Sequence, residues 1–270
     1  MTATTYDFDQ GSATESGANN PALNSAAFQR GLAQAAPAER TGMTASGAYV
    51  KTGLLLVILV LAAAFGWSQV EIALVKGSEM ALPPSWTWLL VLLTFILGIA
   101  GAFAYRSAAI IGPLYALCEG ALLGIVAHYF NLEYEGIVLQ AVVATIAVFT
   151  ATLVLYAVGV IKVTARMATG VTVAIGALAL VWALAWLLSL FGISFQFLYA
   201  PTPLGILLSL GIVVLGALSL PLNFEFVKRA AAAGSPKLME WCAAYGLMLS
   251  LIWMYVSILR LLALLRARES

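Results

Sequence analysis

The strongest constraint on the fold of this chain is a series of apolar runs that follow one another from residue 52 to residue 265. The hydrocarbon core of a bilayer is about 30 Å thick, and a helix needs roughly 20 apolar residues to cross it. The runs lack the alternation of apolar and polar residues that marks barrel strands, so they predict helices. The predicted spans are seven, at residues 52–68, 86–105, 108–130, 137–160, 169–191, 204–227 and 239–265.

The composition agrees with a membrane location. Hydrophobic residues make up 63% of the 270 residues and charged residues only 9%, whereas a soluble domain carries about a quarter of its residues as charged ones. With so few charged residues, the chain could not form the polar surface that surrounds the apolar core of a soluble protein. We therefore predict an all-α integral membrane protein, a seven-transmembrane-helix bundle surrounded by the lipid bilayer. The net charge of +1 gives no argument for nucleic-acid binding.

The first 46 residues differ from the rest, because they are rich in Ala, Gly, Ser, Thr and Asn. Such a segment buries too little apolar surface to offset the entropy lost on ordering. We therefore expect a flexible N-terminal tail at 1–46, a transmembrane domain at 47–265 and a short C-terminal tail at 266–270. The tail lacks the early apolar segment of a signal peptide, so the span at 52–68 would serve as both signal and first helix.

The loops differ in charge between the two sides of the membrane. On the side of the N-terminal tail, the cations near the spans are Lys51, Arg106, Lys162, Arg166, Lys228, Arg229 and Lys237, and the other side has Lys76 alone. By the positive-inside rule this bias predicts a cytoplasmic N-terminus in the cell (plasma) membrane. Seven spans then place outside the C-terminal end of the chain, which carries Arg260, Arg266 and Arg268. Either these arginines reach the outer interface, or the last span does not fully cross.

Small residues recur at every fourth position of the span at 108–130. Ala116, Gly120 and Gly124 form one ridge of a helix there. Lipid provides no hydrophobic drive for helix association, so small residues serve to let helix backbones approach closely. The ridge predicts close helix packing, with the lining of a water path as the alternative.

Glu119 and Glu225 are acidic residues that lie within predicted spans. Glu119 is near the middle of its span, where a carboxyl group must be protonated, paired or hydrated. It indicates either ion or proton handling or a buried structural hydrogen bond. Glu225 lies at helical spacing from Lys228 and Arg229, so an ion pair is the simplest interpretation there. For Ser250 we expect a hydrogen bond between helices.

Several short segments along the chain carry a resemblance to known proteins. They are Asn20-Pro with Lys51-Thr-Gly-Leu-Leu, Pro113-Leu-Tyr-Ala-Leu-Cys-Glu-Gly-Ala-Leu-Leu-Gly124, Gly159-Val-Ile-Lys-Val-Thr164, Leu222-Asn-Phe-Glu225 and Ser257-Ile-Leu-Arg-Leu-Leu262. In this order they resemble the Bax inhibitor/YccA family, also called the transmembrane Bax-inhibitor-motif family, and its bacterial, actinobacterial-type members in particular. The resemblance covers about residues 47–265 and implies a bundle whose last helix is enclosed by the other six.

The resemblance also implies, for some members, a pH-sensitive calcium leak. In those members two carboxylates share a proton and a basic residue after the second span pairs with the first of them, because close like charges raise one pKa toward neutrality. The acid positions fall on Asn223 and Ser250 here, and Arg106 matches the basic residue. Both acids are therefore missing, although Glu225 lies two residues from the first position. The departure puts the pH sensor, and calcium leak with it, in doubt.

Two functions remain as hypotheses. The first is a leak for calcium or protons in ion or stress homeostasis, in which Glu119 and the group formed by Arg106, Asn223, Glu225 and Ser250 would act in the ion path or its gating. The alternative is a non-conducting modulator of a membrane partner such as a membrane protease. We expect no enzyme, because the last span lacks a retinal-binding lysine, His128 is the only histidine, and GxSG and HExxH are both absent. We expect no cofactor and no metal site.

Overall fold

The computed structural model describes residues 42–75, 78–103, 105–192 and 200–269. Most of the tail predicted at 1–46 therefore lies outside the described residues. The helices of the described part are α3 (Ala45–Ser68), α4 (Thr87–Phe103), η1 (Tyr105–Ser107), α5 (Ala108–Glu133), α6 (Ile137–Ala157), α7 (Ala165–Ser189), α8 (Pro203–Ala232) and α9 (Met239–Glu269), and the strands are β1 (Glu71–Val75) and β2 (Ser78–Leu82).

Threonine caps define the starts of three long helices. The hydroxyl groups of Thr44, Thr164 and Thr202 accept hydrogen bonds from backbone N–H groups in the first turns of α3, α7 and α8. These bonds satisfy donors that have no partner within the helix. At the end of α8, Gly234 has a positive φ of 68°, a conformation that glycine adopts without strain and that commonly ends helices.

Each predicted span contains a helix, but the helix ends differ from the prediction. The first helix begins at Ala45 and not near Thr52, because the Thr44 cap allows the polar residues before the apolar run to join it. Six helices of the described part are long and apolar enough to cross a membrane. The helix α4 is apolar over Thr87–Gly101 but shorter. The protein is thus a helical membrane protein with six spanning candidates among the described residues, and the count of seven stays a prediction.

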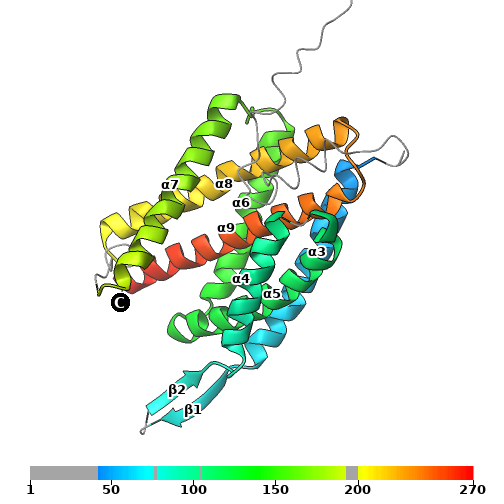
Figure 1. Cartoon of the computed structure of the whole chain (residues 1–270). Coiled ribbons are helices and arrows are strands. Elements are labelled where there is room, and N and C mark those ends of the chain that lie inside the picture. Colours follow the sequence, from blue (N-terminus) through cyan, green and yellow to red (C-terminus); the bar gives the residue numbers. More distant parts are fainter. Residues whose placement is uncertain (1–41, 76–77, 104, 193–199, 270) are drawn as a thin grey trace, which may run out of the picture.

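A β-hairpin connects α3 to α4, and the prediction of only helices did not include it. The strands are antiparallel, with Glu71 opposite Leu82 and Val75 opposite Ser78. The hairpin projects from one end of the bundle (Figure 1). Strands of five residues are far shorter than a membrane span, so a search for long apolar runs passes over them.

Close backbone contact joins α3 and α5 along their length. Ala116 is completely buried, and a Cβ atom on Gly120 or Gly124 would overlap carbonyl oxygens of α3. From the other side, a Cβ atom on Gly66 would overlap the carbonyl oxygen of Ala121. The ridge of small residues in α5 therefore lies directly against the α3 backbone.

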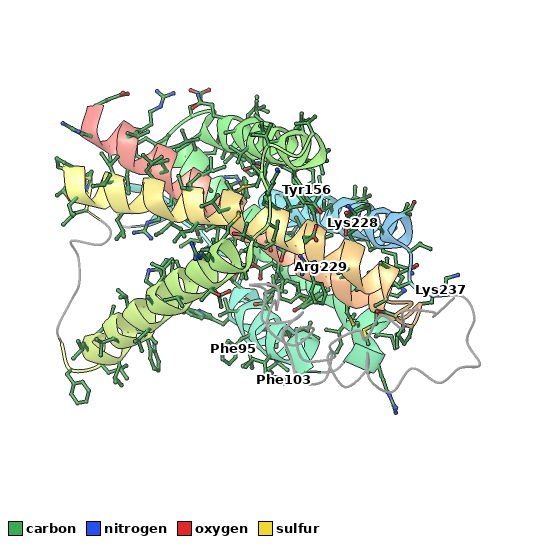
Figure 2. The ribbon with its side chains drawn as sticks, turned by 90° about the horizontal axis from the view of Figure 1, so that it is seen from above. Phe95, Phe103, Tyr156, Lys228, Arg229 and Lys237 are labelled. Carbon is green, nitrogen blue, oxygen red and sulfur yellow. The ribbon has the colours of Figure 1, made fainter. Side chains whose placement is uncertain are left out.

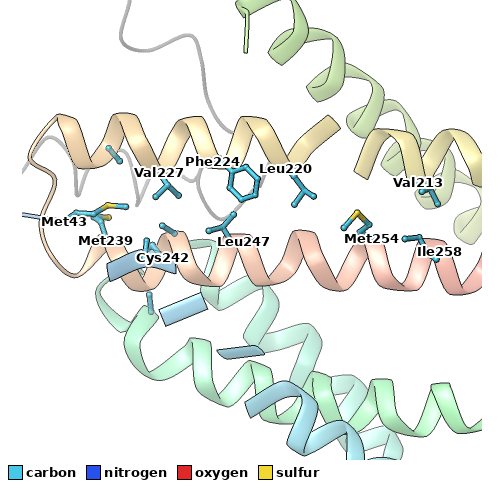
Figure 3. Packing of buried hydrophobic residues seen from close by; sticks show 14 of the residues in the cluster. Met43, Val213, Leu220, Phe224, Val227, Met239, Cys242, Leu247, Met254 and Ile258 are labelled. Carbon is cyan, nitrogen blue, oxygen red and sulfur yellow. The ribbon is translucent and has the colours of Figure 1, made fainter. Parts of the chain in front are cut away.

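The helices α8 and α9 run antiparallel, and their facing side chains form the largest apolar core (Figures 1 and 3). Phe224 is central, because its ring makes edge-on contacts with Tyr49 of α3 and Phe149 of α6. The last helix packs against α3, α5, α6 and α8, and α7 packs against α8. The complete enclosure of α9 by six helices stays a prediction.

The ends of the helices define two sides of the bundle. On the side where α3 begins, called the tail side below, Met43 donates a backbone hydrogen bond of 2.6 Å to Ser235, between α8 and α9. On the opposite side, called the far side, the ring nitrogen Nδ1 of His128 lies 3.1 Å from the carbonyl oxygen of Trp67. The start of α9 is thus on the tail side, and its basic C-terminal end points to the far side.

Candidate functional site

Buried polar side chains are distributed along α9. Glu240, Ser250 and Ser257 are all buried on this helix. They lie at successive depths, since each residue of a helix advances about 1.5 Å. Because buried polar groups in a membrane are costly unless they are paired, the partners of these groups indicate what the bundle can do.

On the tail side, Glu240 forms a buried cluster with the start of α3. Its Oε2 atom pairs with Nζ of Lys51, while its Oε1 atom accepts hydrogen bonds from the backbone N–H of Thr44 at 2.9 Å and from the Thr44 hydroxyl at 3.0 Å. Lys51 Nζ also lies 5.4 Å from the ring centroid of Trp241. We call Thr44, Lys51 and Glu240 the Glu240 cluster.

The Glu240 cluster joins α3 and α9, the first and last helices among the described residues. Only 3% of the Glu240 side chain is exposed, so its charge depends on Lys51 and Thr44 for compensation. A Cβ atom on Gly47 would overlap this carboxylate, which explains why glycine occupies that position. The sequence analysis did not identify Glu240. The only local sign of this cluster in the sequence is an acidic residue in the first turn of an apolar helix. Its partner Lys51 is 189 residues away, so the sequence does not show that the two side chains pair.

In the middle of the interface between α8 and α9, Asn223 and Ser250 contact each other. Asn223 Nδ2 donates a hydrogen bond of 2.7 Å to Ser250 Oγ, which in turn lies 3.2 Å from the carbonyl oxygen of Gly246. Asn223 is completely buried and Ser250 is 8% exposed. Asn223 Oδ1 has no hydrogen-bond partner among the described residues. The two positions that the family resemblance assigns to the acid pair are therefore in contact, and both carry neutral groups.

Glu225 lies two residues after Asn223 on α8 and has its own partners. Tyr156 donates a hydrogen bond of 2.6 Å to Glu225 Oε2, and Arg229 Nε donates one of 2.7 Å to Oε1. Figure 2 labels Tyr156, Lys228 and Arg229 near one another, where α6 comes close to α8. The ion pair at helical spacing that the sequence predicts is thus confirmed with Arg229.

Arg106 lies in η1 with an exposed side chain. The contacts just described link Asn223 to Ser250 and Glu225 to Tyr156 and Arg229. The predicted pairing of Arg106 with Asn223 or Glu225 therefore stays a prediction.

Glu119 lies in a cluster with two tyrosines. It is half-buried on α5 and hydrogen-bonds to Tyr115, one helical turn earlier. The ring of Tyr115 packs edge-on against Tyr245 of α9, with ring centroids 5.3 Å apart. Tyr245 Oη lies 3.4 Å from the carbonyl oxygen of Leu97 in α4. The structure thus places Glu119 beside hydroxyl groups at the meeting point of three helices.

Long apolar helices with buried polar groups along the last of them define a multi-pass α-helical membrane protein. A family profile described as Bax inhibitor 1 like matches residues 19–267, so the chain belongs to the Bax inhibitor 1 like family. Nothing in this match indicates an enzyme. No curated protein and no solved structure matches the chain.

Proposed function

We propose that the protein is an ion leak of the cell membrane, acting in ion or stress homeostasis, whose conduction has no near-neutral pH switch at the α8–α9 interface. Its N-terminus would be cytoplasmic, with seven spans and with α9 enclosed by the other helices. The observation that carries the proposal is the hydrogen bond between Asn223 and Ser250 at the place of the acid pair.

The chemistry of the pair supports this conclusion. An amide and a hydroxyl group do not titrate near neutrality, whereas two adjacent carboxyls do. Raising the pH would charge both members of an acid pair and separate the helices that carry them. The Asn223–Ser250 hydrogen bond is unaffected by such a change, so α8 and α9 stay joined there at every physiological pH.

Glu119 is the group that we propose handles the ion, and its surroundings favour protons over calcium. Calcium takes six to eight oxygen ligands, several of them from carboxylates. Among the described residues, no three His, Cys, Asp or Glu side chains are grouped in a way that could hold a metal. One carboxyl group with Tyr115 and Tyr245 beside it provides exchangeable protons instead.

Flux through purified protein in liposomes tests the absence of a pH switch. We expect proton flux above that of empty liposomes, with little change in the protein-dependent part between pH 6 and 8 once the proton gradient is held equal. The double variant Asn223→Asp/Ser250→Asp should conduct more at pH 8 than at pH 6, because the new carboxylates repel each other when both are charged. Flux equal to empty liposomes at every pH would refute the leak.

The role of Glu119 is tested separately with Glu119→Gln. This change keeps the size of the side chain and removes the exchangeable carboxyl proton, so we expect at least a tenfold loss of proton flux, about 1.4 kcal/mol in the barrier. Glu133→Gln is the matched control, because Glu133 is exposed at the far end of the same helix. If Glu119→Gln conducts as well as the control, the leak does not use Glu119.

A second candidate function is a non-conducting modulator of a membrane partner such as a membrane protease. A groove of about 840 Å³ favours it: α3 and α6 form the sides, and α5 and α9 contribute Leu123 and Leu251. The lining is almost wholly apolar, as a partner helix in lipid would require. A photo-crosslinking residue at Val142 in the groove should capture a partner in cells, whereas one at exposed Val173 on α7 should not.

A further inference from the structure

Two cavities meet at Arg260 in the far half of the bundle. The inner cavity, of about 300 Å³, lies among α5, α7, α8 and α9 and includes Trp182 and Ser209 in its lining. The outer cavity, of about 430 Å³, lies nearer the ends of the helices and includes Tyr134 and Pro201. Arg260 and Val256 line both cavities, so the guanidinium group lies at their junction.

The charge that lines the two cavities is positive. Arg260 is the single charged residue that lines either cavity in the described part of the chain. Most of the other lining residues are aliphatic or aromatic. A guanidinium group in such surroundings favours an anion, and its planar array of donors matches the oxygens of a phosphate.

A second polar group lines the inner cavity and can serve the same ligand. Ser209 is 1% exposed, and its hydroxyl group has no hydrogen-bond partner among the described residues. The neighbouring Ser257 hydroxyl already donates 2.7 Å to the carbonyl oxygen of Trp253. A buried hydroxyl without a partner is costly, and an anion oxygen in the cavity would accept its hydrogen bond.

The position of Arg260 along α9 favours a lipid as the source of the anion. At about 1.5 Å per residue, Arg260 lies about 31 Å along α9 from Met239 on the tail side. This distance is close to the thickness of the hydrocarbon core, about 30 Å. In a helix that enters the bilayer at Met239 and crosses it upright, Arg260 would lie near the far-side layer of lipid phosphates.

We propose that the two cavities bind an anionic membrane lipid. Its phosphate is held by Arg260 and Ser209, and part of an acyl chain lies against the apolar walls near Val256. A free phosphate offers the same oxygens, but it would lose hydration among these walls without gaining apolar contacts. This inference does not depend on conduction, because a lipid can bind here whether or not the bundle passes ions.

Lipid binding to the full chain tests the proposal. The protein in detergent is titrated with phosphatidylglycerol or phosphatidylcholine, and bound lipid is counted by native mass spectrometry. We expect tighter binding of phosphatidylglycerol, and Arg260→Gln should weaken it about tenfold, the effect of losing one charge-assisted hydrogen bond. Arg266→Gln is the control, because Arg266 is an exposed arginine on the same helix that lines neither cavity.

A second variant keeps the test decisive if Arg260→Gln folds poorly. Val256→Trp fills the junction from a side chain that is 39% exposed and leaves Arg260 in place, so it should also weaken binding of phosphatidylglycerol. Equal binding by the wild type, Val256→Trp and Arg260→Gln would overturn the proposal. Displacement of the lipid by equimolar inorganic phosphate would also overturn it, because the site would then recognise a free anion.

Discussion

Lys51→Met should lower the free energy of unfolding by about 3–5 kcal/mol, because it leaves the buried carboxylate of Glu240 without its cation. The Thr44 hydrogen bonds remain but do not neutralise the charge. The measurement is unfolding of the purified protein by SDS in mixed micelles. The matched control is Lys162→Met, an exposed lysine on the same side of the bundle, which should change the stability by less than about 0.5 kcal/mol.

The double variant Lys51→Met/Glu240→Met separates charge from packing. It removes the unpaired carboxylate together with its partner, so it should recover a large part of the stability lost in Lys51→Met. If Lys51→Met unfolds at the same SDS concentration as Lys162→Met, the ion pair does not stabilise the junction of α3 and α9. If the double variant is no more stable than Lys51→Met, the loss arises from packing.

Gly124→Ala should lower the free energy of unfolding by about 3 kcal/mol. Its new methyl group would overlap the carbonyl oxygen of Ala63 and would lie 2.8 Å from the backbone nitrogen of Trp67. The atoms that the methyl group would overlap belong to the α3 backbone, which cannot change rotamer as a side chain can. The helices α3 and α5 must therefore move apart. The cost is therefore at the upper end of the range for overpacking.

Gly170→Ala on α7 is the matched control for this prediction. A Cβ atom at Gly170 meets nothing within 4 Å, so alanine should be neutral or should stabilise the helix by up to about 1 kcal/mol. Both variants are measured by the same SDS unfolding. Equal stability of Gly124→Ala and Gly170→Ala would show that α3 and α5 are not in backbone contact in the membrane.

Much of the architecture could be predicted from the chain itself because lipid imposes strict requirements. Each apolar run must be about one bilayer thick and must satisfy its own backbone, so the helices are visible as runs of apolar residues. The spacing of Ala116, Gly120 and Gly124 likewise marks a packing face. The β1–β2 hairpin lies outside the membrane helices, where neither requirement applies, and it was not predicted.

The candidate site could be predicted only in part. Glu119 stands out in the sequence as a carboxyl group within an apolar run, and Glu225 has a local partner in Arg229. Tyr115 lies one helical turn before Glu119, a spacing that the sequence shows. Tyr245 comes from α9, far along the chain from Glu119, and nothing in the sequence connects it to this group.

A multi-pass helical membrane protein can be predicted from this sequence, because hydropathy and helix length depend on neighbouring residues. The pairing of Lys51 with Glu240, the contact of Asn223 with Ser250 and the meeting of two cavities at Arg260 are visible only in the folded bundle. These features join helices that are far apart in the chain. They depend on how the helices pack in three dimensions. The spacing of residues along one helix does not show which side chains of another helix will contact them.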